Sequence, residues 1–318
     1  MSGYEIRRYD EADRPAVLEL MGRSLGWRPG DPNAELFRWK HEQSSYGPSP
    51  AWIALDDSGV IGFRTFLRWE FERAGEVVRA VRAVDTATDP AHQGRGIFKA
   101  LTLHGLEELR VDGVSFVFNT PNDQSRPGYL TMGWQVVGRL PVTMRPRSPA
   151  SLARTLRART PAELWSTPTT AGGDAQTVLA DDGLTALLAQ TEGRAGLATH
   201  RTSAHLRWRY GLPELQYRAL LIGRAVEDGV VVFRLRRRGA ALEAALCEVL
   251  APPGRRVGRA LGSVLRQSGA DYLIGIGSAA GMVPLPRQGP LLTCRSIDGT
   301  PLPDWAAVQL RLGDVELF

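Results

Sequence analysis

An internal repeat constrains the fold of this chain more than any other feature of its sequence. Residues 206–209 (LRWR) resemble residues 37–40 (FRWK), and residues 227–234 (EDGVVVFR) resemble residues 57–64 (DSGVIGFR). The two segments of each half are separated by nearly the same length of chain. Self-similarity of this kind marks a structural unit that occurs twice. We therefore expect two domains of similar architecture, and 318 residues allow each domain its own hydrophobic core.

The composition is that of a globular protein, because 43% of the residues are hydrophobic and 23% are charged, which excludes disordered and fibrous classes. The longest apolar runs are far too short to span a membrane, and the polar N-terminal stretch MSGYEIRRYDEADR lacks the apolar core of a signal peptide. Cys247 and Cys294 are the only cysteines and have no metal-binding spacing. We expect buried thiols in a reducing, cytoplasmic compartment and no metal site.

The net charge of +5 is compatible with an anionic cofactor. No stripe of basic residues alternates with aromatic residues, so nucleic acid is not an expected partner. The basic cluster of Arg234, Arg236, Arg237 and Arg238 falls at a predicted strand end and turn, where a solvated cluster is the default interpretation. An arginine-rich amphipathic segment at residues 152–159 could bind a membrane surface, but such a short segment more often packs on its own protein.

The first half of the chain predicts helices, then antiparallel strands, then a strand that leads into a helix. We expect an edge strand at residues 4–9, helices at 13–25 and 34–41, and strands at 51–56 and 59–71. Further elements are expected at residues 97–112 (helix), 114–119 (strand), 126–132 (helix) and 134–138 (strand). In the second half, strands at 242–250 and 272–276 flank a helix at 257–267.

Residues 83–98 (AVDTATDPAHQGRGIF) form the stretch with the clearest chemical signal. A strand is predicted to turn at Asp89-Pro90, pass through a loop with two glycines and enter a helix at Ile97. The first backbone N–H groups of a helix have no partner within the helix, and together with the helix dipole they bind anions. Glycines let the backbone approach such an anion closely. This stretch therefore predicts a phosphate-binding turn.

Residues 93–98 (QGRGIF) resemble the pyrophosphate-binding signature of the GNAT superfamily of acyl-CoA N-acyltransferases, which is Gln or Arg, two variable residues, Gly, one variable residue, and Gly or Ala. Gln93 and Gly96 match this signature, and Phe98 stands where a small residue is usual. A second motif resembles the same family, because Tyr129 precedes a Gly-aromatic pair by four residues. On its own, a tyrosine at such a position is more often a packing residue.

The resemblance implies an α+β/α/β fold of two tandem GNAT-like domains, each with a mixed, mostly antiparallel sheet flanked by helices. We expect an N-terminal catalytic domain at residues 1–145, a linker at 146–176 and a C-terminal domain at 177–318. Residues 251–260 fit the form Arg-x-x-Gly-x-Ala, but they lack a glycine-flanked turn, and no tyrosine precedes a Gly-aromatic pair after them. The C-terminal domain is therefore expected to be degenerate and to shape the substrate cleft.

The activity implied by the resemblance is acetyl-CoA-dependent N-acetyl transfer to a primary amine of a small molecule. Acyltransfer from longer acyl-CoA or carrier-bound donors, acetylation of protein lysines, and CoA binding without catalysis remain alternatives. The expected partners are the amine substrate and, as an option, a second copy of the chain in a homodimer, with no membrane partner.

The resemblance also implies a set of site residues. Tyr129 would be the general acid for the leaving thiolate. Asp85 is the nearest carboxylate that could serve as base, and a buried aspartate paired with an arginine is the alternative. The residues implied to contact the cofactor are Thr86, Ala87, Thr88, Gln93, Gly94, Arg95, Gly96, Ile97, Phe98, Asn119, Asn122 and Ser125.

Overall fold

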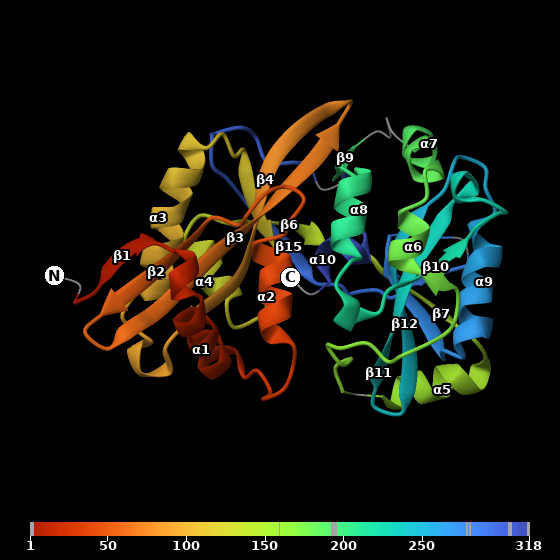
Figure 1. Cartoon of the computed structure of the whole chain (residues 1–318), viewed down its shortest axis with the longest axis horizontal. Coiled ribbons are helices and arrows are strands. Elements are labelled where there is room, and N and C mark those ends of the chain that lie inside the picture. Colours follow the sequence, from red (N-terminus) through yellow and green to blue (C-terminus); the bar gives the residue numbers. More distant parts are fainter. Residues whose placement is uncertain are drawn as a thin grey trace.

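The computed structural model describes residues 3–158, 160–191, 196–277, 279, 281–304 and 307–316. It has two lobes, each built on its own sheet, with the short helix α10 (Leu312–Val315) between them (Figure 1). Each sheet is mixed and mostly antiparallel and has helices packed against it, which confirms the expected fold class. Short 3-10 helices occur at Glu11–Asp13, Pro90–His92, Pro213–Leu215 and Val226–Asp228.

The first sheet has the strand order β1-β2-β3-β4-β5-β15-β6, and β9 and β16 extend it beside β3. Its strands are β1 (Glu5–Arg8), β2 (Ala51–Asp56), β3 (Gly59–Arg73), β4 (Glu76–Thr88), β5 (Phe116–Asn119), β6 (Gln135–Arg139), β9 (Leu197–Thr199), β15 (Leu291–Ser296) and β16 (Val308–Gln309). The pairs β1–β2, β2–β3 and β3–β4 are antiparallel, and the pair β4–β5 is parallel. In the hairpin between β2 and β3, the N–H of Ser58 donates to Asp56 Oδ1, and Gly59 adopts the φ of +107° that the turn requires.

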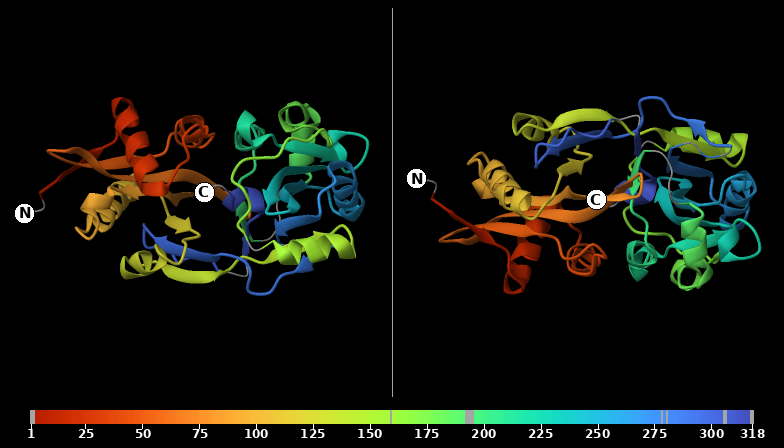
Figure 2. Two further views of the ribbon diagram at one scale, coloured as in Figure 1. Left: turned by 90° about the horizontal axis from the view of Figure 1, so that it is seen from below. Right: turned by 90° about the horizontal axis from the view of Figure 1, so that it is seen from above.

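Helices cover both faces of this sheet (Figure 2). On one side lie α1 (Arg14–Leu25) and α2 (Asn33–His41), whose residues Leu20 and Phe37 pack with Phe63 of β3. On the other side lie α3 (Ile97–Val111) and α4 (Arg126–Thr131). Here Leu101 and Tyr129 join a core with Phe66. Apolar residues on alternate faces of β3 thus anchor helices on both sides.

The second sheet has the order β14-β7-β13-β12-β11-β10-β8. Its strands are β7 (Val142–Pro146), β8 (Gly173–Asp174), β10 (Arg218–Leu221), β11 (Val230–Arg238), β12 (Ala241–Leu250), β13 (Tyr272–Ile276) and β14 (Val283–Pro284). The accompanying helices are α5 (Pro149–Arg157), α6 (Ala175–Leu179), α7 (Gly183–Ala189), α8 (Ser203–Arg209) and α9 (Val257–Ser268). As in the first sheet, one central pair, β12–β13, is parallel. Leu152 of α5, in the amphipathic segment, packs beside Tyr272 on its own protein.

Several strands do not follow chain order in their choice of sheet. Besides β9 and β16, which join the first sheet from the second half of the chain, β15 and β7 do so. The late strand β15 lies between β5 and β6 of the first sheet, where Thr293 faces both Asn119 and Val136. The strand β7 directly follows β6 in the chain but pairs with β13 in the second sheet. Each sheet therefore contains a strand from the segment that the sequence suggested for the other domain. This exchange links the two lobes through hydrogen-bonded ladders as well as through side chains.

The two copies of the repeat meet at the junction of the lobes. Trp39 of α2 and Trp208 of α8 stack with a centroid distance of 5.2 Å and an interplanar angle of 19°. Each indole N–H donates to the backbone carbonyl of the other tryptophan, at 2.7 Å from Trp39 and 2.8 Å from Trp208. This reciprocal contact is what a local two-fold relation between the repeats produces.

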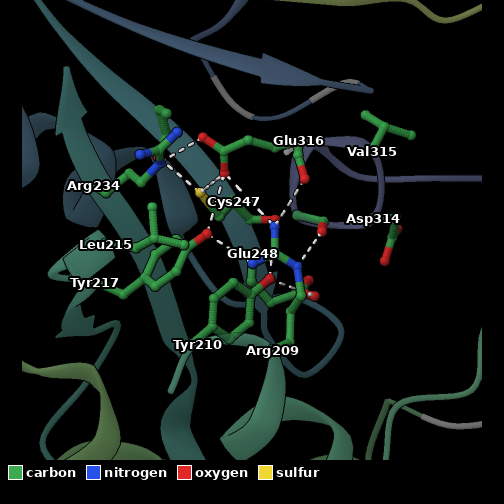
Figure 3. Close-up of polar contacts among 12 residues, drawn as sticks. Arg209, Tyr210, Leu215, Tyr217, Arg234, Cys247, Glu248, Asp314, Val315 and Glu316 are labelled. Carbon is green, nitrogen blue, oxygen red and sulfur yellow. Dashed lines mark hydrogen bonds and ion pairs between the residues drawn. The ribbon is translucent and has the colours of Figure 1, made fainter. Parts of the chain in front are cut away.

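A buried ionic cluster lies beside this contact (Figure 3). The carboxylate of Glu316 accepts a hydrogen bond from Arg234 Nε at 2.6 Å and lies 3.7 Å from Arg209 and 3.6 Å from Arg236. The prediction of a solvated arginine cluster is therefore wrong for Arg234, which is fully buried, and for Arg236, which also pairs with Glu243. These partners come from other parts of the fold, and the local sequence does not reveal them.

Cys247 and Cys294 are buried free thiols, as predicted. Within the described parts of the chain, no helix combines the length and apolarity that membrane crossing needs.

Candidate active site

The turn that precedes α3 is open to solvent on the face where its amides gather. Gly94 and Gly96 adopt φ values of +77° and +76°, and no atom lies within 4 Å of where a Cβ would stand on either glycine. Residues 93–96 are exposed. Among the described residues, no acceptor pairs with the backbone N–H groups of residues 93–98. The turn therefore presents unpartnered donors at the start of a 15-residue helix.

Side chains support this turn from outside its amide face. Asp89 Oδ1 accepts from the N–H of Ala91 at 2.9 Å, and His92 lies 3.1 Å from a carboxylate oxygen of Asp56. The ring of Phe98 packs against Tyr129 at a centroid distance of 5.3 Å, next to Gly128. The bulky residue in place of a small one thus leaves the turn unfilled.

Beside the turn, strands β4 and β5 diverge. Their pairing runs from Ala80–Phe116 to Arg82–Phe118, and within the described strands it does not continue beyond that point, although β4 extends to Thr88. The edge of β4 that faces this gap offers backbone donors and acceptors to an extended ligand chain. Asp85 lies in an irregular stretch of β4 and has a φ of +42°. Such bulges redirect backbone groups, often beside active sites.

Tyr129 is buried on α4 with only 3% of its surface exposed. Its hydroxyl accepts a hydrogen bond from Arg64 Nη1 at 2.8 Å. Arg64 comes from β3, and its guanidinium also lies 4.3 Å from the centroid of the Phe66 ring. The structure therefore brings together Tyr129 and Phe98, which were singled out from the sequence, with Arg64, which was not.

Asp85 is bound by two residues of α2. Its Oδ2 lies 2.7 Å from Lys40 Nζ and 2.8 Å from His41 Nε2. Burial alone would raise the pKa of the Asp85 carboxyl, but the charge of Lys40 and the hydrogen bond from His41 outweigh it and hold this pKa far below its usual range. Burial lowers the pKa of His41, so its ring is neutral at pH 7 and its Nδ1 faces the Ser49 hydroxyl at 3.1 Å.

The other predicted contact residues lie around the same opening. Asn119 ends β5, and its Oδ1 accepts from the Thr293 hydroxyl of β15 at 2.6 Å. Asn122 and Ser125 form the turn before α4, in which Asn122 Oδ1 accepts from the Ser125 N–H and hydroxyl. Thr86 Oγ1 donates to a backbone oxygen of β3, while Ala87 is buried. Each asparagine thus has its oxygen engaged within the protein.

Sequence reasoning missed Lys40, His41 and Arg64. A signal for two of them was present, because Lys40 and Arg64 end the two repeated segments FRWK and DSGVIGFR. The role of His41 depends on the distance between α2 and β4, which no local pattern encodes.

A cavity with a volume of about 760 Å³ lies elsewhere, lined mainly by residues of the second lobe together with residues of the first sheet such as Glu72 and Thr199. Strands β12 and β13 pair from Glu243–Tyr272 to Ala245–Ile274, and the cavity occupies the region beyond, lined by Leu246 to Leu250 and by Gly275. This cavity corresponds to the gap between β4 and β5, because β12–β13 is the parallel central pair of the second sheet. The loop before α9 has one open glycine, Gly254 with a φ of +82°, but the N–H groups of Arg255 and Val257 donate to carbonyls within the loop. The Arg255 side chain also pairs with Asp228.

A family model described as an acetyltransferase (GNAT) domain matches residues 5–137. The matched segment is similar to GNAT acetyltransferase domains and covers the N-terminal part of the chain. The matched segment includes the open turn, the diverging strands and Tyr129, and the match supports an acyltransferase activity. No curated protein matches the chain.

Solved GNAT structures share the fold of nearly the whole chain. A GCN5-related N-acetyltransferase from Kribbella flavida is 17% identical, with a TM-score of 0.64 over 93% of this chain and 72% of that one. One from Anabaena variabilis is 14% identical, with a TM-score of 0.64 over 92% and 73% of the two chains. Eis1 from Mycobacterium abscessus is 15% identical, with a TM-score of 0.58 over 93% and 74%. At these identities the likeness establishes the fold.

Proposed function

We propose that this protein is an acetyl-CoA-dependent N-acetyltransferase that acts on a primary amine of a small molecule. The observation that carries the proposal is the open turn at residues 93–98, whose unpartnered N–H groups stand at the start of α3. A diphosphate fits such a site because the amides converge on one point and the helix dipole favours negative charge. Among the described residues, no atom lies within 4 Å of the Cβ positions of Gly94 and Gly96 in this turn.

The other contacts that we propose between the protein and CoA lie around the same turn and gap. Gln93 to Phe98 would hold the diphosphate, and the backbone of Thr86, Ala87 and Thr88 would pair with the pantetheine arm along the free edge of β4. The side-chain amides of Asn119 and Asn122 and the hydroxyl of Ser125 lie across the gap, where they can contact the arm and the nucleotide end.

For the reaction, the amine must lose a proton. An amine with a pKa of about 10 costs about 4 kcal/mol to deprotonate at pH 7. Asp85 is a weak proton acceptor while Lys40 neutralises it, so we assign proton uptake to the Asp85–His41 pair, in which the anion stabilises a protonated His41 ring. Tyr129 donates its proton to the sulfur of the leaving thiolate.

The experiment is a thiol-release assay with acetyl-CoA and a panel of small amines, read with the wild type and Tyr129→Phe. We expect turnover with at least one amine, and we expect Tyr129→Phe to lower kcat by about 100-fold or more while the CoA dissociation constant stays within about threefold. Tyr9→Phe, on the α1 side of the same sheet, is the matched control and should keep full activity. Full activity of Tyr129→Phe would remove the assigned acid, and a lack of turnover with every amine would refute the acceptor class.

A further inference from the structure

The last residue of the repeated segment is an arginine in both halves of the chain, but the two arginines have different surroundings. Arg64 on β3 and Arg234 on β11 are both fully buried. Arg234 is neutralised by the carboxylate of Glu316, and it also donates to the Leu164 carbonyl at 2.7 Å. The second half of the chain thus supplies its buried guanidinium with an internal counterion.

Arg64 has no such counterion. Its Nη1 donates to the Tyr129 hydroxyl, while its Nε and Nη2 are buried without an acceptor among the described residues. No carboxylate of the described chain lies within ion-pair distance of Arg64. Asp85 is already bound to Lys40 and His41.

Such an arrangement disfavours the folded state. A buried charge without a partner costs several kcal/mol, and an apolar side chain of similar size at the same place is often neutral or stabilising. Aromatic rings at 4.3 Å (Phe66) and 5.8 Å (Phe98) offset part of this cost through cation–π attraction. Because stability does not explain why a guanidinium is buried at this position, we look for the explanation in its contact with Tyr129.

We propose that Arg64 is a positioning residue for acyl transfer, which holds the Tyr129 hydroxyl and stabilises the negative charge that appears when Tyr129 gives up its proton. The inference rests on the proposed function. Arg64 Nη1 occupies a lone pair of the Tyr129 oxygen, so the O–H proton points away from Arg64 and is free to be donated to another acceptor.

In the step concerned, the neutral amine nitrogen forms a bond to the acetyl carbon and loses one proton to solvent, and the carbon–sulfur bond breaks with its electron pair on sulfur. The Tyr129 proton moves to that sulfur and gives the free thiol. The phenolate remains beside the Arg64 guanidinium until it regains a proton from solvent. A preorganised donor in a water-excluded site stabilises this charge far better than water does.

The test uses Arg64→Met with two donors, acetyl-CoA and S-acetylthiophenol, whose thiol is more acidic. With acetyl-CoA we expect kcat to fall about 100-fold and KM to stay within about threefold. With S-acetylthiophenol the loss should shrink to below about fivefold, because a good leaving group needs little help from an acid. Arg126→Met, which removes an exposed charge from α4, is the matched control and should leave kcat unchanged with both donors.

Three further readouts separate a role of Arg64 in the reaction from a role in the stability of the fold. The melting temperature of Arg64→Met should equal or exceed that of the wild type, and Arg64→Lys should recover at least a tenth of the activity. In a Tyr129→Phe background, Arg64→Met should cause no further loss. An equal loss with both donors, an additive loss with Tyr129→Phe, or failure of Arg64→Met to fold would overturn the proposal. If Tyr129→Phe itself is fully active, the proposed function fails instead.

Discussion

Replacing Glu316 with glutamine should destabilise the protein strongly, although the two side chains have nearly the same shape. The Glu316 carboxylate is 2% exposed and faces three guanidinium groups, those of Arg209, Arg234 and Arg236. Glutamine keeps the volume and can still accept a hydrogen bond from Arg234, but it leaves these charges without their counterion.

Two arguments give the magnitude. Breaking a buried ion pair by removing one partner costs about 3–5 kcal/mol. Independently, burial would raise the pKa of Glu316, but the three arginines, Arg234 first, lower it from 4.5 to about 2. This pKa difference corresponds to about 3 kcal/mol of stability, which is present above pH 4.5 and is lost as the pH falls toward 2.

The assay is urea unfolding at pH 7.5, followed by tryptophan fluorescence. Glu316→Gln should lower the free energy of unfolding by about 3–5 kcal/mol. The control is Glu19→Gln, because Glu19 is 73% exposed and pairs with Arg23 on the surface, and it should change stability by less than about 0.5 kcal/mol. A loss below about 1 kcal/mol for Glu316→Gln would refute the view that this carboxylate is the counterion of the lobe junction.

Three further outcomes follow from the structure. Burial lowers the pKa of His41 and lowers that of His205 well below 6.5. The free energy of unfolding from urea titrations should therefore fall as the pH drops from 7.5 to 5.5, by at most about 2.7 kcal/mol per pH unit. A free energy of unfolding that does not change with pH would contradict neutral buried rings. Trp39→Phe and Trp208→Phe should each lower the free energy of unfolding by about 1–2 kcal/mol. A double-mutant cycle should give a coupling energy of about 1 kcal/mol, and additive losses would contradict the reciprocal contact. Gly105→Ala should destabilise by about 1–3 kcal/mol in thermal unfolding, because the new Cβ would lie 2.9 Å from the Trp52 ring; a gain of about 1 kcal/mol, as in an exposed helix, would contradict this packing.

The parts of the fold that the sequence predicted correctly are those encoded by local patterns. The strand at residues 51–56 and the start of the helix at Ile97 agree with the structure, because period-two apolar patterns and glycine turns act over a few residues. The repeat predicted two similar sheets, and both are present. The exposed glycine turn is also a local feature.

The parts that could not be predicted depend on neighbours far away in the chain. Residues 291–296 form a strand that the sequence did not predict, and no local pattern reveals that they pair with Asn119 and Val136 in the first sheet. The same holds for charge, because an arginine run looks solvated until Glu316, which lies more than 80 positions away, neutralises it. The contact between Arg64 and Tyr129 arises in the same way, since β3 and α4 meet only in the folded chain.

The most direct test of the central claim is a crystal structure of the protein grown with CoA. The account predicts that the diphosphate lies within hydrogen-bond distance of the backbone N–H groups of residues 93–98, with the pantetheine arm along β4 and the sulfur directed toward the Tyr129 hydroxyl. CoA bound only in the cavity between β12 and β13, or a turn that stays empty at saturating CoA, would contradict it.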